Sequence, residues 1–283
     1  MSPSTARDLL LAELGRGASA AHRPNHAGIG KLSFACRVGA TRLWARVAAD
    51  PDEDQALTTW SRVAGALAER HHAPPVLEVL EVGGRTTLLF PYVYAPVATH
   101  GALRIRRDEA RTVLDRLHAD VALADQLGAP STTAACFTAV WLDRFTADLG
   151  VVEGFVPPDV HAYLADEVAD LAERVAALDT PAAAAVHGDP WPENWLAGPD
   201  RLWLLDWEDL AVGDPVLDEA VLLHHTGAPW PAGPAHDVAR RALLLDDALD
   251  VAADWVEASD PTVRRAKEAA YLRGLEAYRA ALS

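Results

Sequence analysis

Three side chains within residues 186–210 (VHGDPWPENWLAGPDRLWLLDWEDL) have the types and the spacing that suit phosphoryl transfer. Asp189 and Asn194 are separated by four residues, and Asp206 directly follows the apolar run LWLL. Kinases use one carboxylate to accept the proton of the attacking hydroxyl, and an amide oxygen and a second carboxylate to hold magnesium ions. The D-x-x-x-x-N spacing lets both side chains of one tight loop face a single cleft, which a carboxylate at the end of a neighbouring strand can also face.

This stretch closely resembles the aminoglycoside phosphotransferase and choline kinase-like family. The signature of that family is an H-G-D-x-x-x-x-N loop followed by an apolar strand that ends in Asp, and the chain has both, beginning at His187. Asp214 and Asp218 lie in a segment that resembles the G-D-P-x-x-D sequence that follows in the family. Together with a weaker pattern upstream, the resemblance spans roughly Gly28 to Asp218.

The resemblance implies a role for each residue of this stretch. Asp189 would be the catalytic base, Asn194 and Asp206 would be magnesium ligands, and His187 and Asp214 would support the loop and the strand. ATP, or alternatively GTP, would be the phosphoryl donor together with Mg²⁺. The implied fold is α+β, the two-lobed protein kinase-like fold with a small β-rich N-terminal lobe and a larger, mostly helical C-terminal lobe.

The pattern of the first hundred residues agrees with a small β-rich lobe. Strands are predicted in four segments, residues 26–38, 41–47, 76–82 and 85–93. The pair Gly83-Gly84 between the last two segments is a strong hairpin signal. A helix is predicted over residues 52–70, because Trp60, Val63 and Leu67 lie on one apolar face. Five strands with a helix after the third would form this lobe.

The rest of the chain is predicted to be mainly helical. Helices are expected over residues 107–127 and 159–178, the second capped by Asp159 and followed by Pro181. Short strands are expected around Val186 and at residues 202–205, followed by two or three helices. We place the domain boundary at a hinge near residues 90–95, which gives lobes of residues 1–94 and 95–283.

A glycine-rich segment before the second strand is the candidate phosphate-covering loop. Backbone N–H groups of such a loop can bind phosphate oxygens. The candidate nucleotide-binding residues here are Gly28, Gly30, Lys31 and Ser33. An ordinary hairpin turn is the alternative interpretation of the same residues.

Arg46 stands on the predicted strand where kinases carry a phosphate-binding lysine. Its planar guanidinium suits two phosphate oxygens. Trp60 stands where the partner glutamate is expected on the following helix, and the nearest acids are Glu53, Asp54 and Glu69. Either the alignment is off by one helical turn, or the arginine is oriented differently, or Arg46 is an exposed strand cation.

The predicted hinge contributes the last candidate nucleotide-binding residues. Phe90, Tyr92 and Val93 would line it, and its backbone would bind the base through hydrogen bonds. Because such hydrogen bonds come from the main chain, they do not require particular residue types, and the types of these three residues do not by themselves indicate a base-binding role.

Composition narrows the class of protein. The chain has 283 residues, and its formal charge is 25 − 41 = −16, which argues against a nucleic-acid binder. We expect no membrane segment, since no run approaches about 18 apolar residues, and no signal-peptide core at the start, so the expected location is the cytoplasm. Two cysteines are too few for a disulfide framework. The oligomeric state stays open.

The acceptor is expected to be a small molecule with a hydroxyl group. In the family that this chain resembles, the acceptor binds between the catalytic loop and the helical lobe. Residues 246–260 hold six acids and no base, and Asp250 and Asp254 lie on one predicted helix face. These two are candidate contacts to a cationic acceptor such as an aminoglycoside or related antibiotic, and a merely solvated helix face is the alternative.

Other functions remain possible from the sequence. A metabolite kinase for amino alcohols or sugars would use the same motif. A metal-dependent hydrolase could use Asp189, Asp206 and His187, and a non-catalytic kinase-like protein could only bind its ligand. The intact set of Asp189, Asn194 and Asp206 opposes the last interpretation.

Overall fold

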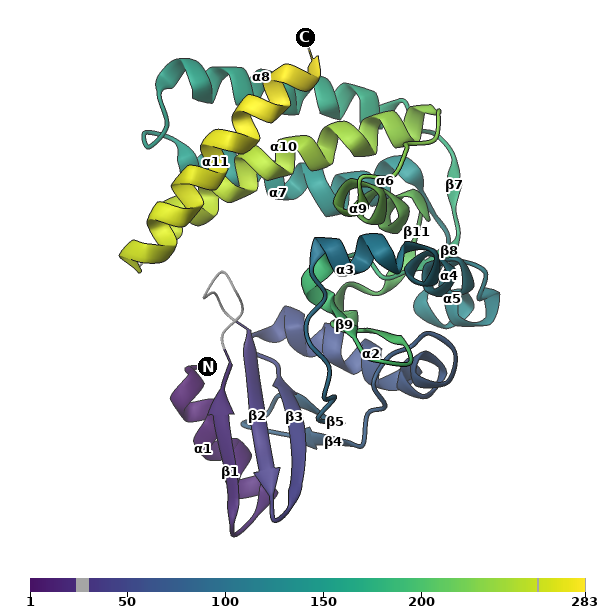
Figure 1. Ribbon diagram of the computed structural model, residues 1–283, viewed down its shortest axis with the longest axis vertical. Helices are drawn as coiled ribbons and strands as arrows, with labels where there is room; N and C mark the ends of the chain where they lie inside the picture. Colours follow the sequence, from purple (N-terminus) through teal and green to yellow (C-terminus); the bar gives the residue numbers. More distant parts are fainter. Residues whose placement is uncertain (24–30, 259, 283) are drawn as a thin grey trace. The chain divides into compact units, whose positions relative to one another are not determined.

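The computed structural model describes residues 1–23, 31–258 and 260–282, and within these the chain divides into two compact units (Figure 1). Unit 1 contains Met1–Gly128 and Asp189–Ala211, and unit 2 contains Ala129–Gly188 and Val212–Ser283. The units therefore do not divide at the expected boundary after residue 94. The reason is local, because backbone hydrogen bonds join residues 96–98 to the strand at residues 195–197.

A five-stranded antiparallel sheet in the order β1-β2-β3-β5-β4 forms the centre of unit 1. Its strands are β1 (Ala18–His22), β2 (Leu32–Val38), β3 (Thr41–Val47), β4 (Glu78–Glu81) and β5 (Thr86–Pro91). Gly83 and Gly84 both have positive φ, as a tight hairpin turn requires. The count of five strands, the helix after the third and the α+β class are confirmed, although the sequence pattern located only four of the strands and did not place β1.

One face of the sheet packs against a helix that the sequence pattern did not predict. The helices of unit 1 are α1 (Pro3–Leu14), α2 (Pro51–Arg70), α3 (His100–Ile105), α4 (Arg107–His118) and α5 (Val121–Leu127). Ala6 and Leu10 of α1 share one hydrophobic cluster with alternate residues of β2, among them Phe34. Pro3 at the start of α1 and the Ser2 side chain, which accepts a hydrogen bond from the Thr5 N–H, fix where the helix begins.

Helix α2 packs against β5 and presents a buried apolar stripe. Asp50 caps its start by accepting hydrogen bonds from the N–H groups of Asp52 and Glu53. Leu57 and Trp60 are buried. The helix begins at Pro51, since proline tolerates the first helical position where an N–H is not needed.

Two of the predicted helix boundaries are wrong. The expected helix over residues 107–127 is two helices, α4 and α5, because Asp120 caps a new start and accepts a hydrogen bond from the Leu123 N–H. The expected cap at Asp159 is absent, because α8 begins one residue earlier at Pro158 and has no side-chain cap. Asp159 instead lies in the first turn, where its negative charge interacts favourably with the positive end of the helix dipole.

Unit 2 is mostly helical. Its helices are α6 (Thr133–Phe137), the π-helix η1 (Thr138–Leu142), α7 (Asp143–Val152), α8 (Pro158–Ala176), α9 (Val216–Thr226), α10 (Pro234–Glu257) and α11 (Pro261–Leu282). Two short strand pairs complete it, β6 (Ser131–Thr132) with β7 (Pro181–Ala182) and β8 (Ala184–Val186) with β11 (Ala211–Gly213). Gly274 lets α11 approach the backbone of α10 closely, since a Cβ there would overlap the carbonyl oxygen of Asp247.

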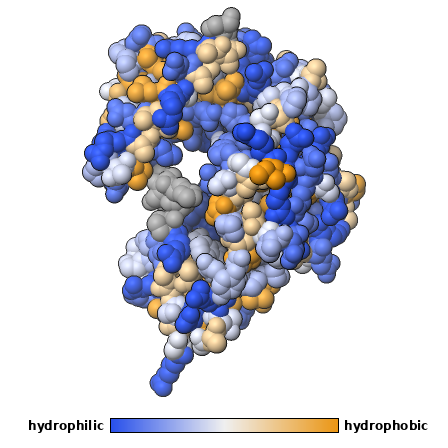
Figure 2. Space-filling model, viewed as in Figure 1, coloured by the Kyte–Doolittle hydropathy of each residue, from blue (hydrophilic) through white to orange (hydrophobic). Residues whose placement is uncertain are grey.

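One face of the molecule is mainly polar (Figure 2). On the face shown in Figure 2, hydrophilic residues dominate, and hydrophobic residues lie in small separate patches. Within the described residues, no helix combines the length and the hydrophobicity that a membrane crossing needs.

Candidate active site

The part of the sequence motif that follows Gly188 lies in unit 1 and ends in a small hairpin. Its elements are the 3₁₀-helix η2 (Pro192–Asn194), β9 (Trp195–Ala197) and β10 (Leu202–Leu204). The Asn194 amide group donates to both the backbone oxygen and the carboxylate of Asp189, each at 2.8 Å. The Leu205 N–H donates to the Asn194 carbonyl at 2.8 Å, which holds the end of β10 and Asp206 beside the loop.

Buried tryptophans fix this loop from behind. The Trp195 indole N–H donates to the Pro190 carbonyl at 3.0 Å, and the Trp207 indole N–H donates to the Leu204 carbonyl at 2.9 Å. Both side chains are fully buried. These two tryptophans therefore pack in the core and also hold the loop backbone by hydrogen bonds.

Asp206 occupies an uncommon backbone conformation. Its φ of 60° lies in the left-handed region, which non-glycine residues rarely adopt outside turns and functional sites. The 3₁₀-helix η3 (Trp207–Asp209) begins directly after it. The Lys31 ammonium donates to the Asp206 carboxylate at 2.7 Å and also forms an ion pair with Glu208.

Negative charge accumulates around Asp189. Burial raises its pKa to about 7, and the carboxylates of Asp209 and Asp206 add to the shift. The positive charge of Lys31 and the hydrogen bond from Asn194 oppose it. A site with this surplus of carboxylates is suited to a bound cation.

Arg46 is buried and paired, which excludes an exposed strand cation. Its guanidinium lies 3.0 Å from the Glu53 carboxylate on α2 and 2.7 Å from the Glu208 carboxylate. Glu53 therefore supplies a helix carboxylate two turns before Trp60, so the arginine is oriented differently from the expected pair. The sequence reasoning named Glu53 as one nearby acid but missed Glu208, whose only signal was its place two residues after Asp206.

A cavity of about 390 Å³ in unit 1 is lined by most of the predicted nucleotide-binding residues. Those residues are Lys31, Ser33, Arg46, Phe90, Tyr92 and Val93, together with the predicted magnesium ligands Asn194 and Asp206. Gly28 and Gly30 lie outside the described residues. The Tyr92 N–H donates to the Arg42 carbonyl at 3.3 Å and is therefore already paired within the sheet.

The supporting residues of the motif lie in unit 2. His187 is fully buried, and its backbone N–H donates to Asp218 at 2.8 Å, as does the Gly188 N–H at 2.9 Å. Asp214 accepts a hydrogen bond from the Thr133 hydroxyl. The carboxylate of Asp218 thus holds the backbone of the motif, a role that the sequence reasoning did not give it.

The acids of α10 face different neighbours within unit 2. Asp246 is buried and forms an ion pair with Arg144 of α7. Asp254 forms an ion pair with Lys267 of α11, while Asp250 lies half-buried, 3.9 Å from the Arg144 guanidinium. The face is therefore not merely solvated, because bases from other helices reach it.

Asp148 of α7 extends this group, which we call the acidic cluster: Asp148, Asp246, Asp250, Asp254 and Glu257. One carboxylate oxygen of Asp148 is buried and has no hydrogen-bond partner among the described residues. Burial raises the pKa of Asp148 to about 6, and the negative charge of Asp250 contributes to this rise.

This raised pKa predicts how stability depends on pH. The folded state holds the Asp148 proton more tightly than the unfolded chain, so this contribution to stability is full below pH 4 and disappears as the pH rises through about 6. Asp148→Asn, which stays neutral, should therefore unfold less readily than the wild type at pH 7.5, by about 1 kcal/mol after allowance for solvent screening.

The measurement is thermal unfolding of both proteins at pH 4 and pH 7.5. Asp166→Asn is the matched control, because Asp166 is exposed on α8 of the same unit. A difference between wild type and Asp148→Asn that does not change with pH would contradict the assigned environment of Asp148.

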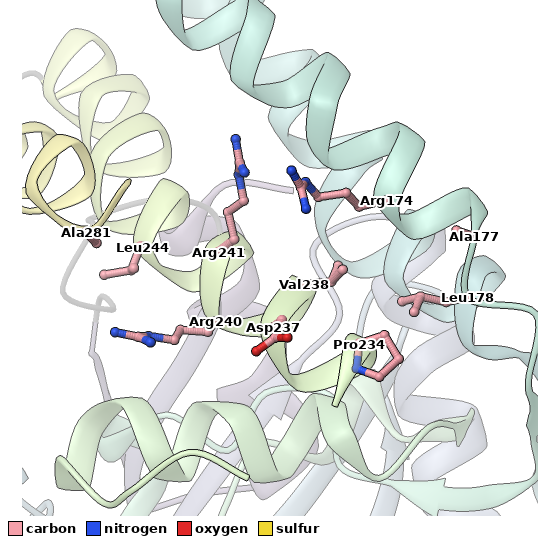
Figure 3. Close-up of a pocket in the computed structure, with 10 residues that line it drawn as sticks. All are labelled: Arg174, Ala177, Leu178, Pro234, Asp237, Val238, Arg240, Arg241, Leu244 and Ala281. Carbon is pink, nitrogen blue, oxygen red and sulfur yellow. The ribbon is translucent and has the colours of Figure 1, made fainter. Parts of the chain in front are cut away.

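A second cavity, of about 440 Å³, lies in unit 2 beside α8 and α10 (Figure 3). It contains three arginines, but two of them are already neutralised. Arg174 pairs with Asp170 at 2.8 Å, and Arg241 pairs with Asp170 and Glu167. None of the residues in the sequence motif lines this cavity, and we do not assign it a role in catalysis.

The residues of unit 1 fit a magnesium–nucleotide pair on two observations. The Arg46 Nε is a buried donor with no partner among the described residues, as expected for a group that meets a phosphate oxygen. Asn194 and Asp206 supply the oxygen ligands that Mg²⁺ prefers.

Comparison with known proteins identifies one sequence family. The sequence model of the phosphotransferase enzyme family matches residues 22–281. No curated protein sequence matches the chain.

Solved structures share the fold at low sequence identity. A choline kinase from Streptococcus pneumoniae is 14% identical with a TM-score of 0.62, covering 92% of this chain and 94% of that one. A thermostable mutant of an aminoglycoside phosphotransferase is 16% identical with a TM-score of 0.64, covering 97% of each chain. A macrolide 2′-phosphotransferase from Brachybacterium faecium is 19% identical with a TM-score of 0.53, covering 94% of this chain and 97% of that one.

Proposed function

Because this chain belongs to the phosphotransferase enzyme family, we propose that it transfers the γ-phosphoryl group of a nucleoside triphosphate, ATP in the first instance, to a hydroxyl group of a small cationic molecule. The observation that carries this proposal is the arrangement of Asp189, Asn194 and Asp206 beside a cavity lined by Arg46 and Lys31. A nucleoside triphosphate is available in the cytoplasm, which is where we propose that the reaction occurs.

Asp189 would act on the acceptor. Its carboxylate would accept the proton of the attacking hydroxyl while the oxygen forms its bond to the γ-phosphorus and the nucleoside diphosphate leaves. The hydrogen bonds from Asn194 hold the carboxylate in position. The residues that are proposed to bind the nucleotide phosphates would not accept this proton.

Arg46, Lys31 and Ser33 would bind the phosphates. The guanidinium of Arg46 is held rigidly by two carboxylates, Glu53 and Glu208, so it can offer its remaining donor without a large loss of side-chain entropy. Phe90 and Val93 would bind the base. When bound at Asn194 and Asp206, magnesium would neutralise the charge that develops on the phosphates.

The acceptor is proposed to be cationic because of the acidic cluster. Five carboxylates stand against two bases there, Arg144 and Lys267, and the buried oxygen of Asp148 has no partner among the described residues. An amino group of the acceptor would supply that partner. Relatives named for aminoglycosides and for choline act on cations, so the cluster supports either class.

The direct test is a magnesium-dependent assay of nucleoside diphosphate formation. The purified protein would be supplied with ATP or GTP and a panel of aminoglycosides, macrolides, amino alcohols and neutral sugars. We expect turnover above the background hydrolysis only with cationic acceptors. Turnover with neutral sugars alone would remove the cationic part of the proposal, and no turnover with any acceptor would favour a ligand-binding protein.

Asp250→Asn tests the acceptor site once an acceptor is known. We expect its KM for the acceptor to rise about threefold to fivefold while kcat stays nearly constant, because a half-buried charge contributes about equally to ground-state and transition-state binding. Asp166→Asn removes the same charge from an exposed position on α8, outside the acidic cluster, and should leave KM unchanged. Equal KM values in wild type and Asp250→Asn would exclude Asp250 from acceptor binding.

A further inference from the structure

Trp60 carries a buried hydrogen-bond donor that lies in the wall of the unit 1 cavity. Its side chain is 4% exposed, and its indole N–H has no hydrogen-bond partner among the described residues. Leaving such a donor unpaired costs about 1–3 kcal/mol. Buried tryptophans usually find a partner for this group.

The other fully buried tryptophans of unit 1 show that its core satisfies indole donors. Trp195 and Trp207 each donate to a backbone carbonyl within 3.0 Å. Trp60 differs from them because it lines the cavity. Four side chains of unit 1 have a buried donor or acceptor without a partner among the described residues, and only Trp60 and Arg46 of these line the cavity.

The two unpaired donors lie toward different ends of the cavity. Glu53, which binds Arg46, precedes Trp60 by seven residues on α2, and seven residues span about 10 Å of helix. The Trp60 ring instead packs against Phe90, with ring centroids 5.0 Å apart. Phe90 is the first residue of the predicted hinge, so Trp60 lies toward the end where the base would bind, and Arg46 toward the phosphates.

We propose that the Trp60 indole N–H donates a hydrogen bond to an acceptor atom of the purine base of the bound nucleotide. This inference rests on the proposed function, which assigns the cavity to a nucleoside triphosphate. Guanine carries the acceptors N7 and O6 on one edge, and adenine carries N7 and an amino donor there. Trp60 stands at the helix position where a glutamate was expected. A glutamate paired with Arg46 could not donate a hydrogen bond to the base, whereas the indole N–H of Trp60 can.

Trp60→Phe is the sharpest variant, because phenylalanine keeps the ring against Phe90 and removes only the donor. We expect calorimetric titration with magnesium to show binding of GTP or ATP weakened about three- to tenfold, with binding of inorganic tripolyphosphate unchanged. Equal losses for the two nucleotides identify N7 as the acceptor, and a larger loss for GTP identifies O6. Trp203→Phe, outside the cavity, is the matched control and should bind as the wild type does.

A second readout does not depend on affinity. In protein labelled with ¹⁵N-tryptophan, the indole N–H signal that Trp60→Phe lacks should shift when a nucleotide is added, and should not shift with tripolyphosphate. Undiminished nucleotide affinity in Trp60→Phe, an unshifted signal, or an equal loss for tripolyphosphate would each overturn the inference. Failure of the wild type to bind any nucleotide would instead overturn the proposed function.

Discussion

Replacing Asp189 with asparagine is expected to lower the rate of phosphoryl transfer by about 10³-fold, while the affinity for magnesium–nucleotide changes by less than about threefold. The reason is that a general base contributes about 10² to 10⁴ in rate, and that the Asp189 carboxylate is proposed to act on the acceptor hydroxyl, not on the nucleotide. Asparagine has the same shape and still accepts a hydrogen bond from Asn194 in place of the carboxylate.

The measurement combines single-turnover kinetics with calorimetric nucleotide titration of the same preparation. Asp200→Asn is the control, since Asp200 is an exposed carboxylate on the turn that joins β9 and β10. A variant Asp189→Asn with the wild-type rate would show that another group accepts the proton. A parallel loss of rate and nucleotide affinity would place Asp189 in nucleotide binding.

Asp206→Asn is expected to weaken magnesium–nucleotide binding by about 100-fold. Loss of a group that only supports a metal ligand already costs about 10- to 100-fold, and Asp206 is proposed as a ligand itself. An ion held by only two protein groups has few ligands to replace the lost charge. Asparagine is the suitable replacement because it tolerates the left-handed backbone that Asp206 adopts. The ion pair between Lys31 and Glu208 remains in the variant and preserves the local packing.

The readout is the rise in melting temperature that nucleotide causes, measured with magnesium and with a chelator. In the wild type, magnesium should enlarge that rise, and in Asp206→Asn the two conditions should agree. The Asp200→Asn control should behave as the wild type. An undiminished effect of magnesium in Asp206→Asn would assign the ion to other ligands.

The sequence was most informative where the needed residues are close together along the chain. The loop from His187 to Asn194 and the strand that ends in Asp206 could be recognised because their spacing already determines which side chains meet. The five-stranded sheet was predictable for the same reason, since its hairpins join neighbouring segments and Gly83-Gly84 marks one turn. The family match and the shared fold confirm the family and the fold, and the roles of the loop residues stay predictions.

Partners that come from distant segments were not predictable. Arg46 pairs with Glu208, which is 162 positions away, and no local pattern announces such a contact. The acids of α10 are similar, because helical periodicity groups them on one face but does not reveal that Arg144 and Lys267 reach that face from other helices. Side-chain pairing between separate elements depends on tertiary packing, which the periodicity of one element does not contain.

The close approach of α10 and α11 has a genetic consequence. Every missense change at Gly274 adds a side chain, and even a single methyl group would overlap the carbonyl of Asp247. The two helices would then have to separate, and Lys267 would move away from Asp254. A single-nucleotide change far from the phosphoryl-transfer loop is therefore expected to destabilise unit 2 and to disrupt the acidic cluster, which is proposed to bind the acceptor.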